Sequence, residues 1–161
     1  MSRTATPSQT VGPYYEIGLC RRRDNELVPA GGPGALTVEG LLLDGQGEPI
    51  SDGMIEVWDA AGKQWGRCGT DAAGAFSFVV AKPAPQADAP HLEVAVFARG
   101  ILRHQLTRIY FPDEVQANDA DPFLAGLSDE ERATLVGAPS DGGIRFDIHM
   151  QGPLATTFFA H

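Results

Sequence analysis

The chain has 161 residues, of which 43% are hydrophobic and 20% charged, and its formal net charge is −9. This length fits one domain with a sizeable core, and the excess of acidic residues argues against a nucleic-acid backbone as the ligand. No apolar stretch approaches the roughly 20 residues of a membrane-spanning helix, and the opening MSRTATPSQT has no apolar signal-peptide core. We therefore expect a soluble, cytoplasmic protein, in which Cys20 and Cys68 stay reduced.

The first segment, residues 1–35, is expected to form an irregular N-terminal arm. It carries TPSQTVGPYY, the basic run Arg21–Arg23 and the Gly/Pro cluster PAGGPGA. These compositions are typical of turns and loops.

From residue 36 onward, short β-like runs alternate with turns rich in Gly, Asp and Pro. The expected strands are LTVEGLLLD (36–44), MIEVWDA (54–60), AFSFVVA (75–81), HLEVAVFA (91–98), LTRIYF (106–111), IRFDIHM (144–150) and TTFFA (156–160). The expected turns are DGQGEP (44–49), DAAGKQWG (59–66) and TDAAG (70–74). This spacing predicts an all-β fold, a single β-sandwich domain over residues 36–161. Trp58, Phe76 and Phe78 alternate with polar or small residues and are candidates for its core.

One segment, SDEERATLVG (128–137), is expected to be helical. Ser128 is a suitable N-cap, Glu131 follows three residues later as in a capping box, and Gly137 ends the helix. We interpret this helix as an addition to the all-β body.

The run from His91 to Arg99 reads HLEVAVFAR. Because side chains alternate across a strand, one face is apolar and faces the core, with Leu92, Val94, Val96 and Ala98. The other face carries His91, Glu93, Ala95, Phe97 and Arg99. The run resembles a metal-binding strand that has lost most of its ligands, which suggests that a partner supplies the missing chemistry.

The sequence has no phosphate-binding GxxxxGK[ST], no GxGxxG entering a helix and no GxSxG nucleophile motif. Its four histidines form no HxH or HExxH pattern. His91 and Glu93 share a strand face and can in principle hold a divalent ion together with His104 or His149. The other interpretation is a hydrogen-bonded structural pair.

Several blocks taken together resemble the intradiol ring-cleavage dioxygenases, and more narrowly their non-iron alpha subunits. These blocks are TPSQTVGPYY (6–15), GEPISDGMIEVWDAAG (47–62), GRCGTDAAGAFSF (66–78), PHLEVAVFARG (90–100), TRIYFPDE (107–114) and RFDIHMQG with TTFF (145–159). The resemblance covers nearly the whole chain. It implies the β-sandwich of that family, with the arm packing on a partner subunit.

The family's catalytic subunit is known for a ferric site held by two tyrosines and two histidines. At the matching positions this chain has Trp65, Gln86, His91 and Glu93, so only the first histidine remains. Tyrosinate supplies the anionic oxygen that stabilises ferric iron, and tryptophan and glutamine cannot. The resemblance therefore implies that Fe(III) is bound by a partner beta subunit and not by this chain, which has no catalytic residues of its own.

By the same resemblance, this chain lines the substrate pocket at the interface with the iron-bearing beta subunit. The implied reaction is the cleavage of 3,4-dihydroxybenzoate by O2 between the two hydroxyl-bearing carbons, giving 3-carboxy-cis,cis-muconate. The residues implied in substrate binding are Thr10, Val11, Gly12, Pro13 and Tyr14 of the arm, together with Arg99. Other charged side chains in the matching blocks, among them Arg108 and Arg145, are expected to form structural pairs.

Two alternatives remain open on the sequence alone. One is a non-enzymatic sandwich module of the transthyretin-like or carboxypeptidase-regulatory kind, which shares the pattern GxP...VWDAxG but lacks TPSQTVGPYY and FARG. The other is a chain that works alone with a metal held by His91, Glu93 and a further histidine.

Overall fold

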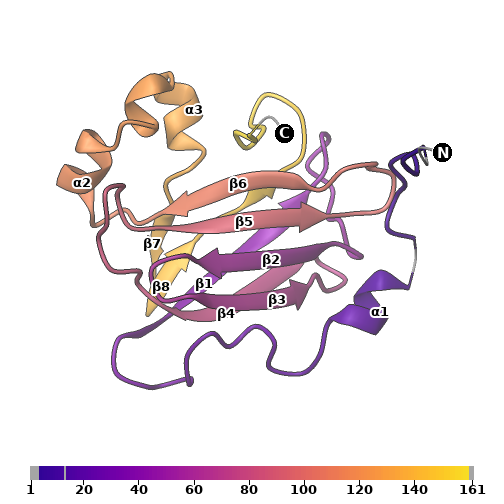
Figure 1. The fold of residues 1–161 in the computed structure, drawn as a ribbon, viewed down its shortest axis with the longest axis horizontal. Helices are drawn as coiled ribbons and strands as arrows, with labels where there is room; N and C mark the ends of the chain where they lie inside the picture. The colour runs from indigo at the N-terminus through magenta and orange to yellow at the C-terminus, as the bar shows by residue number, and fades with distance from the viewer. Residues whose placement is uncertain (1–3, 13, 160–161) are drawn as a thin grey trace.

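Two β-sheets lie face to face and enclose the core of the molecule (Figure 1). The computed structural model describes residues 4–12 and 14–159. One sheet has the order β4-β1-β8-β7, with β9 also paired to β1, and the other has the order β3-β2-β5-β6. The strands are β1 (Ala35–Leu43), β2 (Met54–Asp59), β3 (Gln64–Gly69), β4 (Ala75–Ala81), β5 (His91–Phe97), β6 (Gln105–Tyr110), β7 (Ala138–Ser140), β8 (Gly143–Arg145) and β9 (Ile148–His149). The predicted β-sandwich is confirmed.

Alternating side chains explain why these segments form strands and where they bury their apolar atoms. In β5, Leu92, Val94 and Val96 are buried, and Ala98 just beyond the strand is 3% exposed. Leu92, Val94 and Val96 belong to one core cluster with side chains of the facing sheet, among them Val38, Leu42, Phe76, Phe78 and Ile148. The predicted inward face of the run 91–99 is thus confirmed.

The prediction that Trp58 joins the core is wrong. Phe76 and Phe78 are buried as expected, but Trp58 is 38% exposed. Ile55 and Val57 take the inward positions of β2, so alternation turns Trp58 to the outer face of its sheet.

Three predicted segments differ from the strands observed. The predicted turn 59–66 includes the first residues of β3, but β3 is a strand that pairs with β2 over its whole length. The expected strand 144–150 divides into β8 and β9, which each run parallel to β1. The described part of 156–160 forms no strand, and Phe159 makes only an isolated bridge to Leu106.

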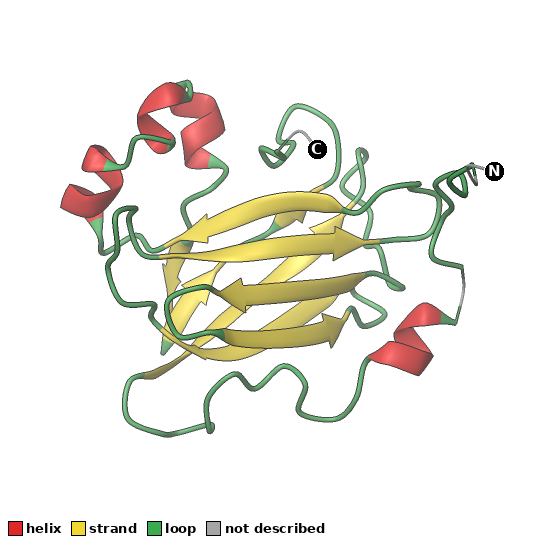
Figure 2. Ribbon diagram, in the orientation of Figure 1, coloured by secondary structure: helices red, strands yellow, loops and turns green. Residues whose placement is uncertain are grey.

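The helices lie outside the sheets (Figure 2). They are α1 (Tyr15–Leu19), α2 (Val115–Ala120), the 3-10 helix η1 (Leu124–Gly126) and α3 (Asp129–Ala133). α3 confirms the predicted start, because Ser128 and Glu131 form the capping box. The expectation of a single helix over 128–137 is wrong, because α3 is shorter and the described residues form three other helices, α1, α2 and η1.

The second half of the N-terminal arm attaches to this chain's own sandwich. The Asn25 side-chain amide donates to the Ser77 carbonyl (2.9 Å), and the Val79 N–H donates to the Asn25 carbonyl (2.9 Å). The Arg67 N–H donates to the Asp24 carbonyl (2.8 Å), so this part of the arm is tied to β3 as well as β4. Placing the domain boundary at residue 35, with the arm on a partner, stays a prediction.

The two ends of the sandwich carry different structures (Figure 1). α2 and α3 lie at the end where β5 begins, and α1 with the start of the arm lies at the end where β5 finishes. Among residues 4–12 and 14–159 there is no helix with the length and apolar character needed to cross a membrane.

Candidate functional site

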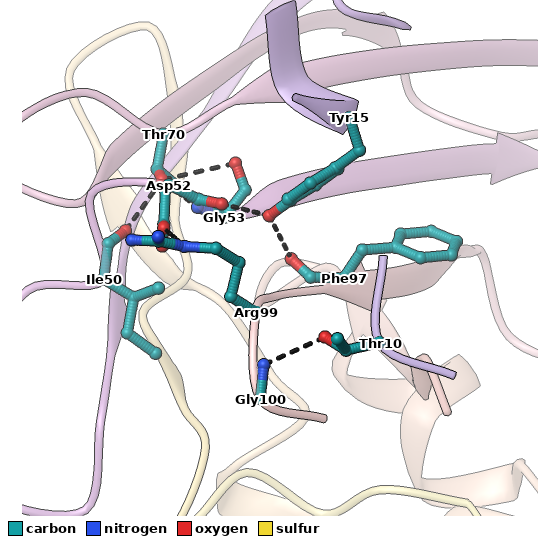
Figure 3. A network of polar contacts seen from close by, with 9 residues as sticks. All are labelled: Thr10, Tyr15, Ile50, Asp52, Gly53, Thr70, Phe97, Arg99 and Gly100. Atoms are coloured by element: carbon teal, nitrogen blue, oxygen red, sulfur yellow. Dashed lines mark hydrogen bonds and ion pairs between the residues drawn. The ribbon is translucent and has the colours of Figure 1, made fainter. Parts of the chain in front are cut away.

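The N-terminal arm is fastened to the finishing end of β5 by side-chain hydrogen bonds (Figure 3). The Gly100 N–H donates to the Thr10 hydroxyl (3.0 Å). Tyr15, only 8% exposed, donates its hydroxyl to the carbonyl oxygen of Asp52 and lies 3.2 Å from that of Phe97. The segment that holds the predicted substrate-binding residues is therefore anchored on both sides.

Arg99 lies in the same network and forms an ion pair between its Nε and an Asp52 carboxylate oxygen (Figure 3). The turn that carries Asp52 is fixed by the buried Thr70. The Thr70 hydroxyl accepts from the Gly53 N–H (2.8 Å) and donates to the Ile50 carbonyl (2.7 Å). The Arg99 side chain is still 58% exposed, so its remaining donors can reach an external group.

An open groove of about 530 Å³ runs between the arm and the loop after β5. Its walls include Val11 from the arm and Leu102 and His104 from the loop, with Phe97 beneath. The His104 ring stacks on Phe97 with centroids 5.3 Å apart. Of the groove residues, Val11 (39%) and Leu102 (61%) are exposed, and Tyr14 (77%) and Ile17 (77%), at and within α1, are exposed at the same end of the molecule. This exposed apolar group is typical of a surface that meets another molecule.

The structure brings most of the predicted substrate-binding residues to this one end. Thr10, Val11 and Arg99 lie at the groove or its anchoring network, and Tyr14 projects outward next to α1. Gly12 has a φ of +78°, which a residue with a side chain adopts only with strain. Pro13 lies outside the described residues. Their role in substrate binding stays a prediction.

The positions that match the family's metal ligands lie at the other end of β5. His91 begins the strand, and its Nδ1 is 2.8 Å from the Ala89 carbonyl oxygen. Together with Gln86 and Glu93 it lines a pocket of about 140 Å³. Trp65 lies farther across the same sheet, on β3, with Arg67 stacked over its ring at 4.7 Å.

This donor set does not fit a ferric ion. The described residues include no group of three or more His, Cys, Asp and Glu side chains able to hold a metal. A metal held by His91 and Glu93 with His104 or His149 is ruled out, because His104 lies against Phe97 at the far end of β5 and His149 belongs to the other sheet; His161 lies outside the described residues.

At this end Arg108, which the sequence predicted only as a member of a structural pair, makes further contacts that the sequence did not predict. Its guanidinium lies over the rings of Phe123 and Phe159, 5.2 and 5.7 Å from their centroids, and donates to the Tyr110 hydroxyl (3.2 Å). Burial raises the pKa of Tyr110, and the bond from Arg108 only partly offsets this. Arg108 stands opposite Glu93 in the register of β5 and β6. Arg108 and Glu93 form the expected ion pair, but at 3.8 Å between the nearest atoms they are too far apart for a hydrogen bond.

The two groups of residues are too far apart to form one pocket. His91 and Phe97 mark the ends of β5, and at ~3.3 Å per residue the strand separates them by about 20 Å. Arg99 lies beyond Phe97, so it cannot reach a ligand held near His91 of the same chain. The contacts of Asp52 with Tyr15 and with Arg99 were not predicted, because each of them joins segments far apart in the sequence.

Comparisons with known proteins show which family the chain belongs to. The protocatechuate 3,4-dioxygenase alpha chain of Burkholderia cepacia is 40% identical over an alignment of 191 residues that covers 96% of each chain. That alignment is longer than this chain, so the relative carries insertions that this chain lacks. The protocatechuate 3,4-dioxygenase beta chain of the same organism is 30% identical over 157 residues, covering 75% of this chain and 66% of the relative.

Among solved structures, the dioxygenase domain of a dioxygenase and carbohydrate-binding fusion from Streptomyces sp. SirexAA-E superposes with a TM-score of 0.62. It is 23% identical and covers 92% of this chain and 99% of the solved chain, which supports the fold. A scan against protein-family models found no match. The alpha-chain match takes in the arm as well as the sandwich, which the non-enzymatic module does not explain. The chain therefore belongs to the intradiol ring-cleavage dioxygenase family, among the relatives of the protocatechuate 3,4-dioxygenase alpha chains.

Proposed function

We propose that this chain is the non-iron alpha subunit of a protocatechuate 3,4-dioxygenase and that it forms part of the substrate pocket at the interface with an iron-bearing beta subunit. The observation that carries the proposal is the separation of the two ends of β5. Arg99 and the arm lie at one end, and the positions of the lost metal ligands lie at the other. Substrate contacts made by Arg99 therefore belong to a site that another chain completes.

The iron in this proposal is held by the beta subunit. The intradiol family implies iron, and the side chains at the matching positions here, with His91 the one remaining ligand, do not fit it. A relative of the beta type matches this chain at 30% identity, so alpha and beta chains share a fold and can pair through similar surfaces.

The exposed apolar residues at the end of the molecule that carries α1 and the groove supply a surface for that pairing. Tyr14, Ile17 and Leu102 are each more than half exposed in the chain by itself, and burying them against a partner removes apolar area from water. This contact would bring Arg99 and the backbone at Gly12 to the edge of the partner's pocket. The location that we propose for this protein is the cytoplasm.

The implied reaction consumes one 3,4-dihydroxybenzoate and one O2. The ring bond between the two hydroxyl-bearing carbons breaks, and each carbon gains one oxygen atom and becomes a carboxyl group of 3-carboxy-cis,cis-muconate. Iron, when bound by the partner, activates the catechol toward O2. This chain's residues bind and orient: Arg99 pairs with the substrate carboxylate, and the arm encloses the ring and excludes water.

The test is to measure iron content and protocatechuate-dependent O2 uptake for this chain expressed alone and then together with a beta chain encoded beside it. We expect iron and O2 uptake only in the co-purified complex. Iron and turnover in the isolated chain would show that this chain binds the metal itself. A stable complex that holds iron but does not consume O2 with protocatechuate would contradict the assigned substrate.

A further inference from the structure

The outer face of the sheet β3-β2-β5-β6 has a hollow on its surface, which we call the outer-face slot. In the strand register Trp65, Trp58, Glu93 and Arg108 form one row across the four strands. In the next row the side chain on β5 is Ala95, which carries only a methyl group. The surface is therefore hollow beside Ala95, with a volume of about 210 Å³.

The walls of the outer-face slot suit a flat ring. Trp58 and Trp65 stand on one side and are 38% and 44% exposed, and Leu106 and Phe159 stand on the other. A cavity of about 150 Å³ is enough to hold benzene in an apolar site, so the slot has room for one aromatic ring with a small substituent.

Arg108 lies at one end of the slot with hydrogen-bonding capacity to spare. Its side chain is 20% exposed, and the hydrogen bond that it makes runs from Nη1 to the Tyr110 hydroxyl (3.2 Å), so the other terminal nitrogen, Nη2, is left for a ligand. The carboxylates of Asp88 and Glu93 lie 3.9 and 3.8 Å away, beyond hydrogen-bond distance. The rings of Phe123 and Phe159 hold the guanidinium in place, which lowers the entropic cost of binding a ligand.

The acidic groups around the slot leave this guanidinium available. Glu56 is paired with Arg67 by a hydrogen bond from Nε (2.8 Å), so its charge is already neutralised. Glu93 is 50% exposed and Asp88 43% exposed, so water screens both of them. A bidentate contact from Arg108 requires a planar anion, and a carboxylate has that shape.

We propose that the outer-face slot binds a monocyclic aromatic carboxylate, with the ring over Ala95 between Trp58 and Leu106 and the carboxylate at Arg108. The site is separate from the groove at the arm end and needs no metal. It does not depend on the proposed enzymatic function, because its ligand is held by this chain alone.

The experiment uses intrinsic fluorescence of the full chain with benzoate as the probe. Trp58 and Trp65 are the two tryptophans of the sequence and both line the slot, so the signal reports on this place only. We expect benzoate to change the emission saturably and benzamide, which has the same shape but no charge, to bind about 10- to 150-fold more weakly. Equal binding of benzamide, or no saturable change with benzoate, would overturn the proposal.

Two variants test the geometry. Ala95→Leu fills the hollow and should abolish the benzoate-dependent change in emission. Arg108→Gln should weaken benzoate binding by the same factor that separates benzamide from benzoate in the wild type. Arg145→Ala on the opposite sheet serves as the matched control and should bind benzoate as the wild type does. Unchanged affinity in Ala95→Leu would refute the slot even if Arg108→Gln fails to fold.

Discussion

Arg99 and Arg108 are both arginines on the β5 to β6 hairpin, yet the chain surrounds them differently. Arg99 is exposed and paired with Asp52, whereas Arg108 is largely buried between aromatic rings. The sequence alone predicts that Arg99 matters, because FARG follows a clear strand. It does not reveal Asp52 or the aromatic contacts of Arg108, because those depend on segments distant in the chain.

We predict that Arg99→Ala in the assembled enzyme lowers kcat/KM for 3,4-dihydroxybenzoate by about 10- to 150-fold, because a charge-assisted contact contributes roughly 1.5 to 3 kcal/mol. Stability should change little, since exposed ion pairs such as Arg99 with Asp52 contribute about 0 to 1 kcal/mol. Steady-state O2 uptake and thermal unfolding of the purified complex measure both quantities.

Arg145→Ala is the matched control for that variant. Arg145 is also exposed, at 47%, and also pairs with an aspartate, Asp147, but it lies on the opposite sheet. It should lose as little stability as Arg99→Ala and keep its kcat/KM. A similar loss of turnover in both variants would mean that Arg99 acts through stability and not through the substrate.

At the scale of single elements, periodicity predicted the long strands well. β1, β2, β4 and β5 bury apolar side chains at alternate positions, and that pattern depends only on local sequence. β3 was missed because QWGRCG has two glycines and no β-branched residue, so its stability comes from pairing with β2. The two short parallel strands on β1 depend on distant pairing in the same way.

Within β1, Gly40 is the position where the element depends on a missing side chain. A Cβ at Gly40 would overlap the carbonyl oxygen of Phe146, which lies between β8 and β9. We predict that Gly40→Ala lowers the free energy of unfolding by about 1 to 3 kcal/mol, because backbone must move to relieve the overlap. Urea unfolding followed by circular dichroism measures the loss. Gly126→Ala, with open space around the new methyl group, is the control and should be close to neutral.

The capping box at the start of α3 determines how the Glu131 carboxyl titrates. The Ser128 backbone N–H donates to the Glu131 carboxylate (2.9 Å) and holds the pKa of Glu131 below its usual value, with the Ser128 hydroxyl contributing further. A carboxyl whose pKa is lower in the folded state stabilises the fold above its unfolded pKa of about 4.3 and loses that effect as the pH falls through the folded pKa. We expect the Glu131 carboxyl to titrate below pH 4.3 in an NMR titration.

The variant Ser128→Ala separates the two bonds of the capping box. It keeps the backbone N–H but removes the hydroxyl that accepts from the Glu131 N–H (3.2 Å). The Glu131 pKa should rise toward the usual value without reaching it. N-cap replacements of this kind cost about 0.5 to 2 kcal/mol of stability. A Glu131 pKa that is the same in both proteins would show that the hydroxyl does not contribute.

At the scale of the whole molecule, one sandwich core connects two ends that carry different side-chain networks. The arm end holds Tyr15 through the carbonyls of Asp52 and Phe97, and the other end carries α2 and α3 (Figure 1). The core cluster contains side chains from both sheets, and a second, smaller cluster of Ala89, Tyr110, Leu124 and Leu135 includes Tyr110 of β6, which lies between Ile109 and Phe111 of the first cluster. This continuity favours cooperative unfolding of the entire chain, arm included, because residues 24–28 hydrogen-bond to β3 and β4.

A double variant with one substitution at each end of the sandwich tests whether the chain unfolds cooperatively. Tyr15→Phe removes the hydroxyl at the arm end and should cost about 1 kcal/mol, and Ser128→Ala acts at the start of α3. Because the sites share no partner and lie far apart, their effects on the free energy of unfolding should add to within about 0.5 kcal/mol, with one transition and an unchanged m-value. Urea unfolding monitored by both tryptophan fluorescence and circular dichroism measures this. Separate transitions from the two probes would mean that the arm unfolds on its own, and the boundary at residue 35 would then mark a true division of the chain.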